Sequence, residues 1–252
     1  MLATLLEIHP VTERDTRYVF HCPAVAQAAR PGQFVELKLT DGFQTPFLRR
    51  PISLFDTDGK DTFSLLVRSV GRGTEWMRTW EPGRTVDVLG PLGRGFWWNP
   101  GMKTCVLVAG GIGLAPLELL IRRLLEEGLQ VRLLFSPRRD HQLLEALPLR
   151  EQLEIAESEN RSTLTAALEP LLDGADILFA CGPEGLLETA ARTAAAHGIP
   201  SQLSMERRMA CGIGICLGCA IAIRADGRLT YQKVCKDGPV FAGEEVAFDE
   251  NP

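Results

Sequence analysis

The sequence lacks an excess of positive charge. Its 27 lysines and arginines stand against 32 aspartates and glutamates, which gives a net charge of −5 at pH 7. Affinity for a phosphate backbone comes mainly from clustered Lys and Arg side chains. The charge balance therefore argues against nucleic acid or anionic lipid as a binding partner.

Also missing is any apolar run long enough to cross a bilayer. The longest, residues 105–117, is broken by glycines and by Pro116, so no membrane-spanning helix is expected. No basic residue precedes the short apolar stretch at the N-terminus, and Glu7 interrupts that stretch, which argues against a secretory signal. The sequence predicts a cytoplasmic protein without a membrane anchor.

The composition does not suggest disorder either. Hydrophobic residues make up 45% of the chain and charged residues 23%, as in ordinary globular proteins. A length of 252 residues suggests two domains with an appendage.

Three regions follow one another along the chain. Residues 1–99 contain short alternating strands at 17–20, 34–39, 62–67 and 85–89, which predict an antiparallel β-barrel or sandwich. Residues 100–200 alternate apolar strands with helical segments, at 104–109, 114–127, 131–135, 176–180 and 184–197, which predicts an α/β domain with a parallel sheet. Residues 201–252 form a third module, in which Asp226-Gly227 predicts a hairpin turn.

Four of the seven cysteines lie close together in this last module. Cys211, Cys216, Cys219 and Cys235 follow the spacing C-x4-C-x2-C-x15-C, the plant-type pattern of a [2Fe-2S] cluster. Gly212, Gly214 and Gly218 would let such a loop turn tightly around an anionic core. The alternative is a four-cysteine zinc site, although zinc ribbons usually carry two C-x2-C pairs.

Two glycine-containing turns follow predicted strands of the α/β domain. Gly110, Gly111 and Gly113 lie between a strand and a helix, where a diphosphate can approach backbone N–H groups. Their spacing is not that of the Rossmann fingerprint, and tight packing alone is the alternative. Cys181-Gly182-Pro183 ends the next strand, at the edge where open parallel sheets bind ligands; alternatively, Cys181 is a small buried residue.

The first region carries two elements suited to phosphate. Arg50-Pro51-Ile52-Ser53 offers a guanidinium fork, and Gly73-Thr74 lies where Thr74 could cap a helix. A solvated arginine and an ordinary helix cap are the alternative interpretation. The occurrence of these elements beside the two glycine turns favours nucleotide binding.

With these motifs together, the chain resembles the ferredoxin-NADP reductase-like flavoproteins and, within them, the electron-transfer subunits of class 1B dihydroorotate dehydrogenases. The resemblance covers essentially the whole chain, and its most specific part is the segment from Glu206 to Cys219. The resemblance implies FAD bound by Arg50, Pro51, Ile52, Ser53, Leu66, Val67, Arg68, Gly73 and Thr74, NAD at Gly110, Gly111, Gly113, Cys181, Gly182 and Pro183, and the cluster on the four cysteines. Ile52 stands where many of the broader reductases carry an aromatic residue, so it cannot stack on the flavin as a π-face.

The resemblance also implies a partner. An FMN-containing catalytic subunit would oxidise dihydroorotate in pyrimidine biosynthesis, and electrons would pass through the cluster and FAD to NAD in a heterotetramer of two copies of each chain. The four histidines are scattered without a shared motif, and we expect no catalytic base for dihydroorotate on this chain.

Two other functions remain open from the sequence. One is a reductase subunit for ferredoxin, a hydrogenase or a glutamate-synthase-like partner, since the same modules recur. The other is a zinc-bearing flavin-binding protein that docks or senses without catalysis. Arg138 and Arg139 could receive the 2′-phosphate of NADP, whereas the resemblance favours NAD.

Apolar side chains surround Cys216 in the sequence: Ile213, Ile215, Leu217 and Ala220. An exposed apolar patch marks an interaction site, so we expect this face to dock the flavoprotein partner. The alternative is that these side chains fold inward as a small local core.

Overall fold

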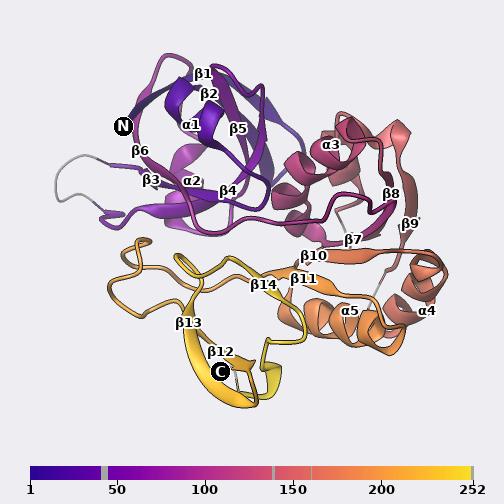
Figure 1. Cartoon of the computed structure of the whole chain (residues 1–252). Coiled ribbons are helices and arrows are strands. Elements are labelled where there is room, and N and C mark those ends of the chain that lie inside the picture. The colour runs from indigo at the N-terminus through magenta and orange to yellow at the C-terminus, as the bar shows by residue number, and fades with distance from the viewer. Residues whose placement is uncertain (41–44, 138–139, 160, 251–252) are drawn as a thin grey trace.

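The computed structural model describes residues 1–40, 45–137, 140–159 and 161–250. Three parts are visible in Figure 1: a barrel, a sheet flanked by helices and a C-terminal hairpin module. Within the described residues, no helix is both long and apolar enough to cross a membrane.

The N-terminal part is a closed antiparallel barrel in the order β1-β2-β5-β4-β3-β6. Its strands are β1 (Leu2–Pro10), β2 (Asp15–His21), β3 (Phe34–Lys38), β4 (Arg50–Thr57), β5 (Thr62–Arg68) and β6 (Thr85–Leu92), with the short helices α1 (Pro23–Ala28) and α2 (Arg72–Met77). Alternating apolar side chains fill the interior, including Tyr18, Phe20 and Phe63. The predicted antiparallel barrel is confirmed.

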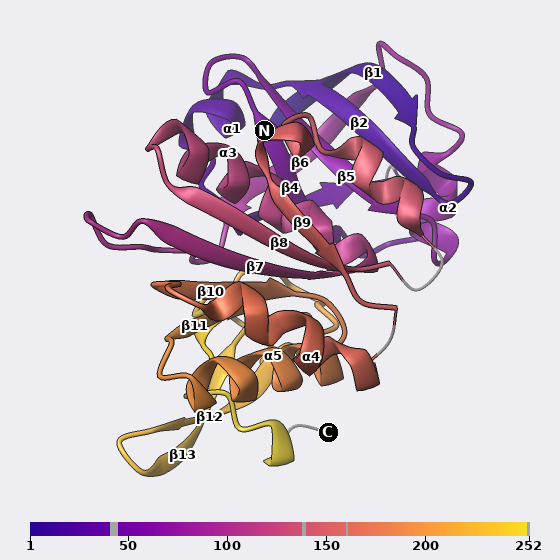
Figure 2. The same cartoon turned by 90° about the vertical axis from the view of Figure 1, so that its right-hand side faces the viewer.

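The second part is a six-stranded sheet in the order β14-β11-β10-β7-β8-β9. It comprises β7 (Thr104–Gly110), β8 (Gln130–Ser136), β9 (Glu154–Glu157), β10 (Ile177–Cys181), β11 (Ser201–Ser204) and β14 (Val240–Ala242), of which only β14 runs antiparallel to its neighbour. The 3₁₀ turn η1 (Gly111–Leu117) and α3 (Glu118–Glu126) lie on the face toward the barrel, and α4 (Arg161–Leu172) and α5 (Glu184–Ala196) cover the other (Figure 2). Shorter 3₁₀ turns are η2 (His141–Ala146), η3 (Arg150–Gln152) and η4 (Phe248–Glu250).

The predicted helix over residues 114–127 differs in its first turn. Residues 111–117 form the 3₁₀ turn η1, with Pro116 inside it, and the α-helix begins only at Glu118. Proline lacks the N–H group that an α-helical turn would use there. The apolar face of the helix still packs on the sheet, through Leu120, Ile121 and Leu124.

The C-terminal module is tied into the sheet. β12 (Ala220–Ala225) and β13 (Arg228–Lys233) form the predicted hairpin, in which Ala225 pairs with Arg228 around Asp226-Gly227. However, β11 and β14, on either side of the cysteine segment, are strands of the large sheet. The boundary that we expected after residue 200 therefore falls just before a strand of the α/β domain.

The two larger parts share one hydrophobic interface. Phe55 of β4 and Leu66 of β5 belong to the same buried cluster as Leu114, Leu117 and Leu120. This contact fixes how the barrel faces the glycine turn, and hence the shape of the site between them.

Candidate functional site

A cavity of about 700 Å³ lies between the barrel and the α/β domain. Its walls come from three segments: the starts and ends of barrel strands, the turn after β7, and the chain leading from β11 to Cys211. The lining residues are Phe34, Arg50, Pro51, Ile52, Ser53, Leu66, Val67, Arg68, Val70, Thr74, Ile112, Ala115, Pro116, Ser204, Met205, Glu206, Arg207, Arg208, Met209 and Pro239.

The two phosphate-suited elements of the barrel meet in this cavity. Arg50 begins β4, and its guanidinium donates hydrogen bonds to the Leu48 and Arg49 carbonyls at 2.8 and 3.2 Å. A Cβ at Gly73 would lie 2.8 Å from Arg50 Nε, so only a residue without a side chain allows this approach. The structure thus brings Arg50 beside Gly73-Thr74, although their contact with FAD remains a prediction.

Thr74 caps the helix as we expected, although from the third helical position and not as the N-cap residue. Helix α2 begins at Arg72, with Gly71 before it, so Thr74 lies inside the first turn. Its Oγ1 accepts the N–H of Val70 at 3.0 Å and that of Gly71 at 3.3 Å. The Thr74 hydroxyl therefore holds the two residues that precede the helix against its first turn.

Arg68 is held by both domains. Its guanidinium donates to Asp15 from Nε and Nη2, and Nη2 also lies 2.7 Å from Asp140, which follows β8 of the α/β domain. Arg68 Nη1 would lie 3.5 Å from a Cβ at Gly111. Leu66, Val67 and Arg68 line the cavity as a unit, but the Arg68 side chain is engaged by two carboxylates.

The two glycine turns of the α/β domain pack directly against each other. A Cβ at Gly113 would lie 2.6 Å from the carbonyl carbon of Cys181, and one at Gly110 would lie 2.7 Å from Pro183 Cδ. Burial raises the pKa of the Cys181 thiol, as expected for a small packed residue. Close packing accounts for Gly110 and Gly113, and the nearby Ile112 lines the cavity.

The four cysteines are arranged as two pairs. Cys216 lies beside Cys211 and Cys219 lies beside Cys235, and the Cys219 sulfur accepts the Cys235 N–H at 3.5 Å. Backbone N–H groups of Ile213, Cys216 and Ile215 lower the pKa of Cys211 to about 6, which favours the thiolate that metals bind. In the part of the chain that the structure describes, no three His, Cys, Asp or Glu side chains are arranged so that they could hold one metal ion together.

This donor set fits a [2Fe-2S] cluster. Two pairs of thiolates suit two irons, whereas a structural zinc ion takes four ligands around one centre. The loop turns at Gly212 and Gly214, whose φ values of +65° and +85° favour glycine. Such turns aim backbone N–H groups at sulfur.

Glu36 is a residue of this region that the sequence analysis missed. It is buried on β3, and neither of its carboxylate oxygens has a hydrogen-bond partner among the described residues. Burial raises its pKa to about 7, against the opposing effect of Arg49 and Arg50. A Cβ at Gly212 would lie 2.7 Å from the Glu36 carboxyl carbon. Its only sequence signal is an acid within the apolar run of residues 34–37.

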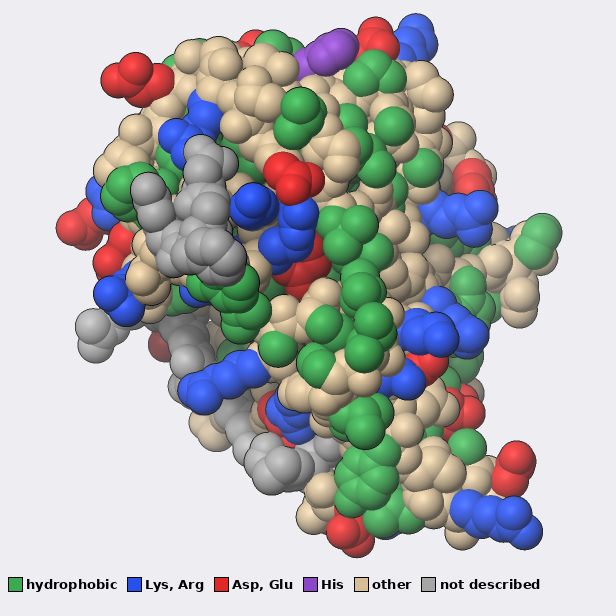
Figure 3. Space-filling view, turned by 90° about the vertical axis from the view of Figure 1, so that its left-hand side faces the viewer, with side chains coloured by type: hydrophobic (Ala, Val, Ile, Leu, Met, Phe, Trp, Pro, Cys, Tyr) green, Lys and Arg blue, Asp and Glu red, His purple; other side chains and the backbone are tan. Residues whose placement is uncertain are grey.

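The apolar residues around Cys216 point outward. Ile213, Ile215 and Leu217 are 46%, 75% and 64% exposed. Figure 3 shows a band of hydrophobic side chains down one face of the molecule. These three side chains therefore do not form the inward-facing local core considered as the alternative.

Comparison with known proteins identifies the family. A curated relative from Desulforamulus reducens, the electron transfer subunit of dihydroorotate dehydrogenase B (NAD(+)), is 33% identical over 98% of both chains. The corresponding subunit of Bacillus mycoides is 38% identical over 89% of both chains. The chain belongs to the family of dihydroorotate dehydrogenase B electron transfer subunits. The resemblance inferred from the sequence motifs is confirmed.

The cysteine module of this chain also matches a family model of its own. Residues 206–247 match the family model for the iron-sulfur cluster binding domain of dihydroorotate dehydrogenase B. The match begins at Glu206, which lines the cavity, and contains all four paired cysteines.

Solved structures share the architecture. A structure of NADH-dependent reduced ferredoxin-NADP oxidoreductase aligns with 100% of this chain and 91% of its own, with a TM-score of 0.85 and 28% identity. Phthalate dioxygenase reductase aligns with a TM-score of 0.64 over 96% of this chain and 95% of its own. At 16% identity, the latter supports the fold alone.

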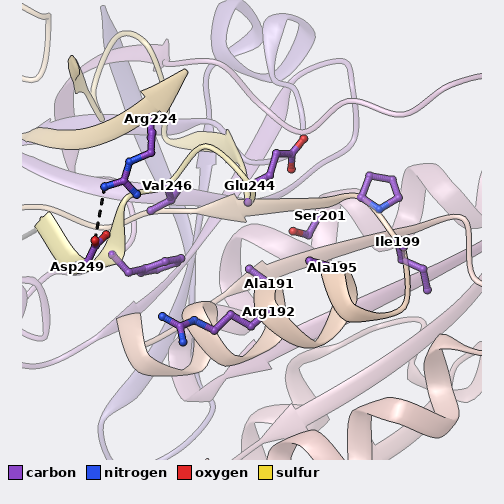
Figure 4. Close-up of a pocket in the computed structure, with 13 residues that line it drawn as sticks. Ala191, Arg192, Ala195, Ile199, Ser201, Arg224, Glu244, Val246 and Asp249 are labelled. Atoms are coloured by element: carbon purple, nitrogen blue, oxygen red, sulfur yellow. Dashed lines mark ion pairs between the residues drawn. The ribbon is translucent and has the colours of Figure 1, made fainter. Parts of the chain in front are cut away.

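A second cavity, of about 610 Å³, lies between α5 and the C-terminal segment. Arg224 and Asp249 point toward each other there, 3.5 Å apart, and Arg192 lies on the α5 side (Figure 4). None of the predicted site residues lines this second cavity.

The histidines remain dispersed in the structure. His9 lies on β1, His21 on β2, His141 in η2 and His197 after α5. None of the four lines the cavity between the domains. The predicted 2′-phosphate contacts, Arg138 and Arg139, lie outside the described residues.

Proposed function

We propose that this chain is the NAD-linked electron transfer subunit of a dihydroorotate dehydrogenase that serves pyrimidine biosynthesis in the cytoplasm. A separate FMN-containing subunit oxidises dihydroorotate, and this chain delivers the electrons to NAD+. The observation that carries the proposal is the cavity between the domains, because its wall continues from the Arg50 motif, past the glycine turn, into the segment that ends at Cys211.

Three sets of residues would hold the cofactors. Arg50, Pro51, Ile52 and Ser53, with Leu66, Val67, Arg68, Gly73 and Thr74, would bind FAD. Gly110, Gly111, Gly113, Cys181, Gly182 and Pro183 would shape the nicotinamide side, and Cys211, Cys216, Cys219 and Cys235 would hold the [2Fe-2S] cluster. Bound FAD exchanges a hydride with a nicotinamide and single electrons with an iron-sulfur cluster.

The chain's own residues position these reactions. Arg50 offers a guanidinium fork to a diphosphate, and the apolar Ile52 and Ile112 line the cavity from opposite domains. The exposed Ile213, Ile215 and Leu217 would dock the catalytic subunit and exclude water from the cluster, in a heterotetramer of two copies of each chain.

The purified protein tests the cofactor assignment. We expect flavin absorption, a broad visible shoulder bleached by dithionite, and stoichiometric iron. Stoichiometric zinc without flavin would instead support the docking or sensing alternative. Reduction of the flavin by NADH rather than NADPH is expected, whereas an NADPH preference lost in Arg138→Ala would contradict the choice of NAD.

Reconstitution with the catalytic subunit tests the partner. Dihydroorotate-dependent reduction of NAD+ is expected only when both chains are present. The likeness to the NADH-dependent reduced ferredoxin-NADP oxidoreductase structure favours a ferredoxin-linked reductase as the second candidate. Electron transfer from reduced ferredoxin, with none from dihydroorotate, would select that candidate.

A further inference from the structure

The contact between the barrel and the α/β domain contains a buried acid that the proposed electron transfer does not use. Glu118 is the first residue of α3, and its side chain is 0% exposed. Neither carboxylate oxygen has a hydrogen-bond partner among the described residues. An ionised carboxylate in such a place is strongly destabilised.

Charged groups from both domains face Glu118. Asp56 comes from barrel strand β4, Arg17 comes from β2, and Arg122 lies one turn further along α3. Burial and the charge of Asp56 raise the pKa of Glu118 to about 8, and the two arginines oppose this shift. Glu118 is therefore protonated at neutral pH in the arrangement observed.

Arg122, which could pair with an ionised Glu118, is already paired with Asp56. Arg122 Nη2 donates to Asp56 Oδ2 at 2.5 Å, and Asp56 Oδ1 accepts the Thr57 N–H at 2.8 Å. The Nε groups of Arg122 and Arg17 are buried without a hydrogen-bond partner in the described structure. The two N–H donors and the Glu118 carboxyl thus lie without partners in the described interface, where a different arrangement of the domains could join them once the carboxyl is ionised.

We propose that Glu118 is a proton-dependent latch between the flavin-side barrel and the nicotinamide-side domain. With its carboxyl protonated, the domains close as observed, with Arg122 on Asp56. When the proton leaves, the carboxylate repels Asp56 and competes for Arg122 and Arg17, and the contact between β4 and α3 loosens.

The latch adjoins the cavity between the domains. Ala115 and Pro116, which line the cavity, lie in the 3₁₀ turn η1 that leads into α3, and Ser53 lies on the same strand as Asp56. Loosening the contact between β4 and α3 would therefore widen the space in which the two domains meet. The inference rests on this contact and would hold whatever electron donor the chain serves.

The sign of the pH effect follows from the raised pKa. The folded chain binds the Glu118 proton more tightly than the unfolded chain does, so the contribution of this group to stability falls as pH rises from about 4.5 to about 8. Above that range the contribution no longer changes. The interface should accordingly open on the alkaline side of neutrality.

Hydrogen–deuterium exchange of the full chain with its bound cofactors tests the latch. Amide protection in residues 50–57 and 118–126, corrected for the intrinsic pH dependence of exchange, is measured from pH 6 to 9. Release of one proton predicts about a tenfold loss of protection between pH 7 and 9 in the wild type. Glu118→Gln should hold its protection constant, and Glu126→Gln, an exposed change on the same helix, should behave as the wild type.

A second variant keeps the test decisive if Glu118→Gln does not fold. Asp56→Asn removes the like charge and frees Arg122, so it should move the loss of protection to lower pH. Constant protection in the wild type, an equal loss in Glu118→Gln, or an unmoved midpoint in Asp56→Asn would each overturn the proposal.

Discussion

Asp15, whose side chain has no exposed surface, accepts two hydrogen bonds from the guanidinium of Arg68. Arg68 Nε donates to Asp15 Oδ1 at 2.8 Å, and Nη2 donates to Oδ2 at 2.9 Å. The same guanidinium reaches Asp140 of the α/β domain. Arg68, which the family resemblance predicts to contact the flavin, thus also ties the two domains together.

Replacing Arg68 by alanine should destabilise the fold strongly. The change leaves the Asp15 carboxylate buried without its charged partner, which costs about 3–5 kcal/mol. Denaturant unfolding measures the loss. Arg123→Ala is the control, because Arg123 pairs with Glu126 at 2.9 Å on the surface, and such pairs contribute about 1 kcal/mol at most. Equal losses in the two variants would show that the Asp15 pair is not structural.

Gly113→Ala should disturb the packing of the two glycine turns. The new methyl group would clash with the backbone of Cys181, and overpacking of this kind costs about 1–3 kcal/mol. Thermal unfolding of the full chain measures the effect. Gly71→Ala serves as the control, since nothing lies within 4 Å of its Cβ position and its φ is extended. A Gly113→Ala variant as stable as the control would contradict the close packing.

Cys216→Ser should remove the iron-sulfur cluster and leave FAD bound, because the predicted flavin contacts lie in the barrel. Hydride exchange between nicotinamide and FAD should survive, while electron delivery to a one-electron acceptor through the cluster falls. Iron content and the visible spectrum measure the loss of the cluster, and flavin content measures the retention of FAD. Cys22→Ala, a change within the barrel core, should keep its iron. Retained iron and an unaltered spectrum in Cys216→Ser would count against the ligand assignment.

Ile215→Lys should abolish assembly with the catalytic subunit while keeping the cluster. A charge placed beside the exposed Ile213 and Leu217 opposes burial against a partner, and the Ile215 side chain is already exposed. Light scattering of the mixed subunits and iron content of the variant separate the two effects. Leu6→Lys, an exposed change on β1, should assemble normally. Loss of iron without a specific defect in assembly would mean that Ile215 supports the cluster loop instead.

Residue spacing and periodicity predicted the features that lie within short segments of the chain. The spacing of the four cysteines indicated the type of centre, because Cys211, Cys216 and Cys219 come from one loop and must follow a fixed interval, with Cys235 supplied just after the hairpin. Asp226-Gly227 predicted the hairpin since both residues adopt positive φ, 51° and 71°. Alternation of apolar residues predicted the barrel strands, as side chains on a strand alternate between its two faces.

Features that depend on the approach of distant segments could not be predicted in this way. Sequence patterns place Glu36 and Glu118 in apolar surroundings, but they do not show that the cysteine loop covers one and the barrel covers the other. The return of β14 to the sheet beside β11 is likewise a matter of long-range pairing, for which three residues carry no local signal. The sequence by itself determined the kinds of centre and domain, because these follow from local spacing and periodicity. Only the tertiary structure decided which charges are buried together, because burial depends on the surface that another part of the chain supplies.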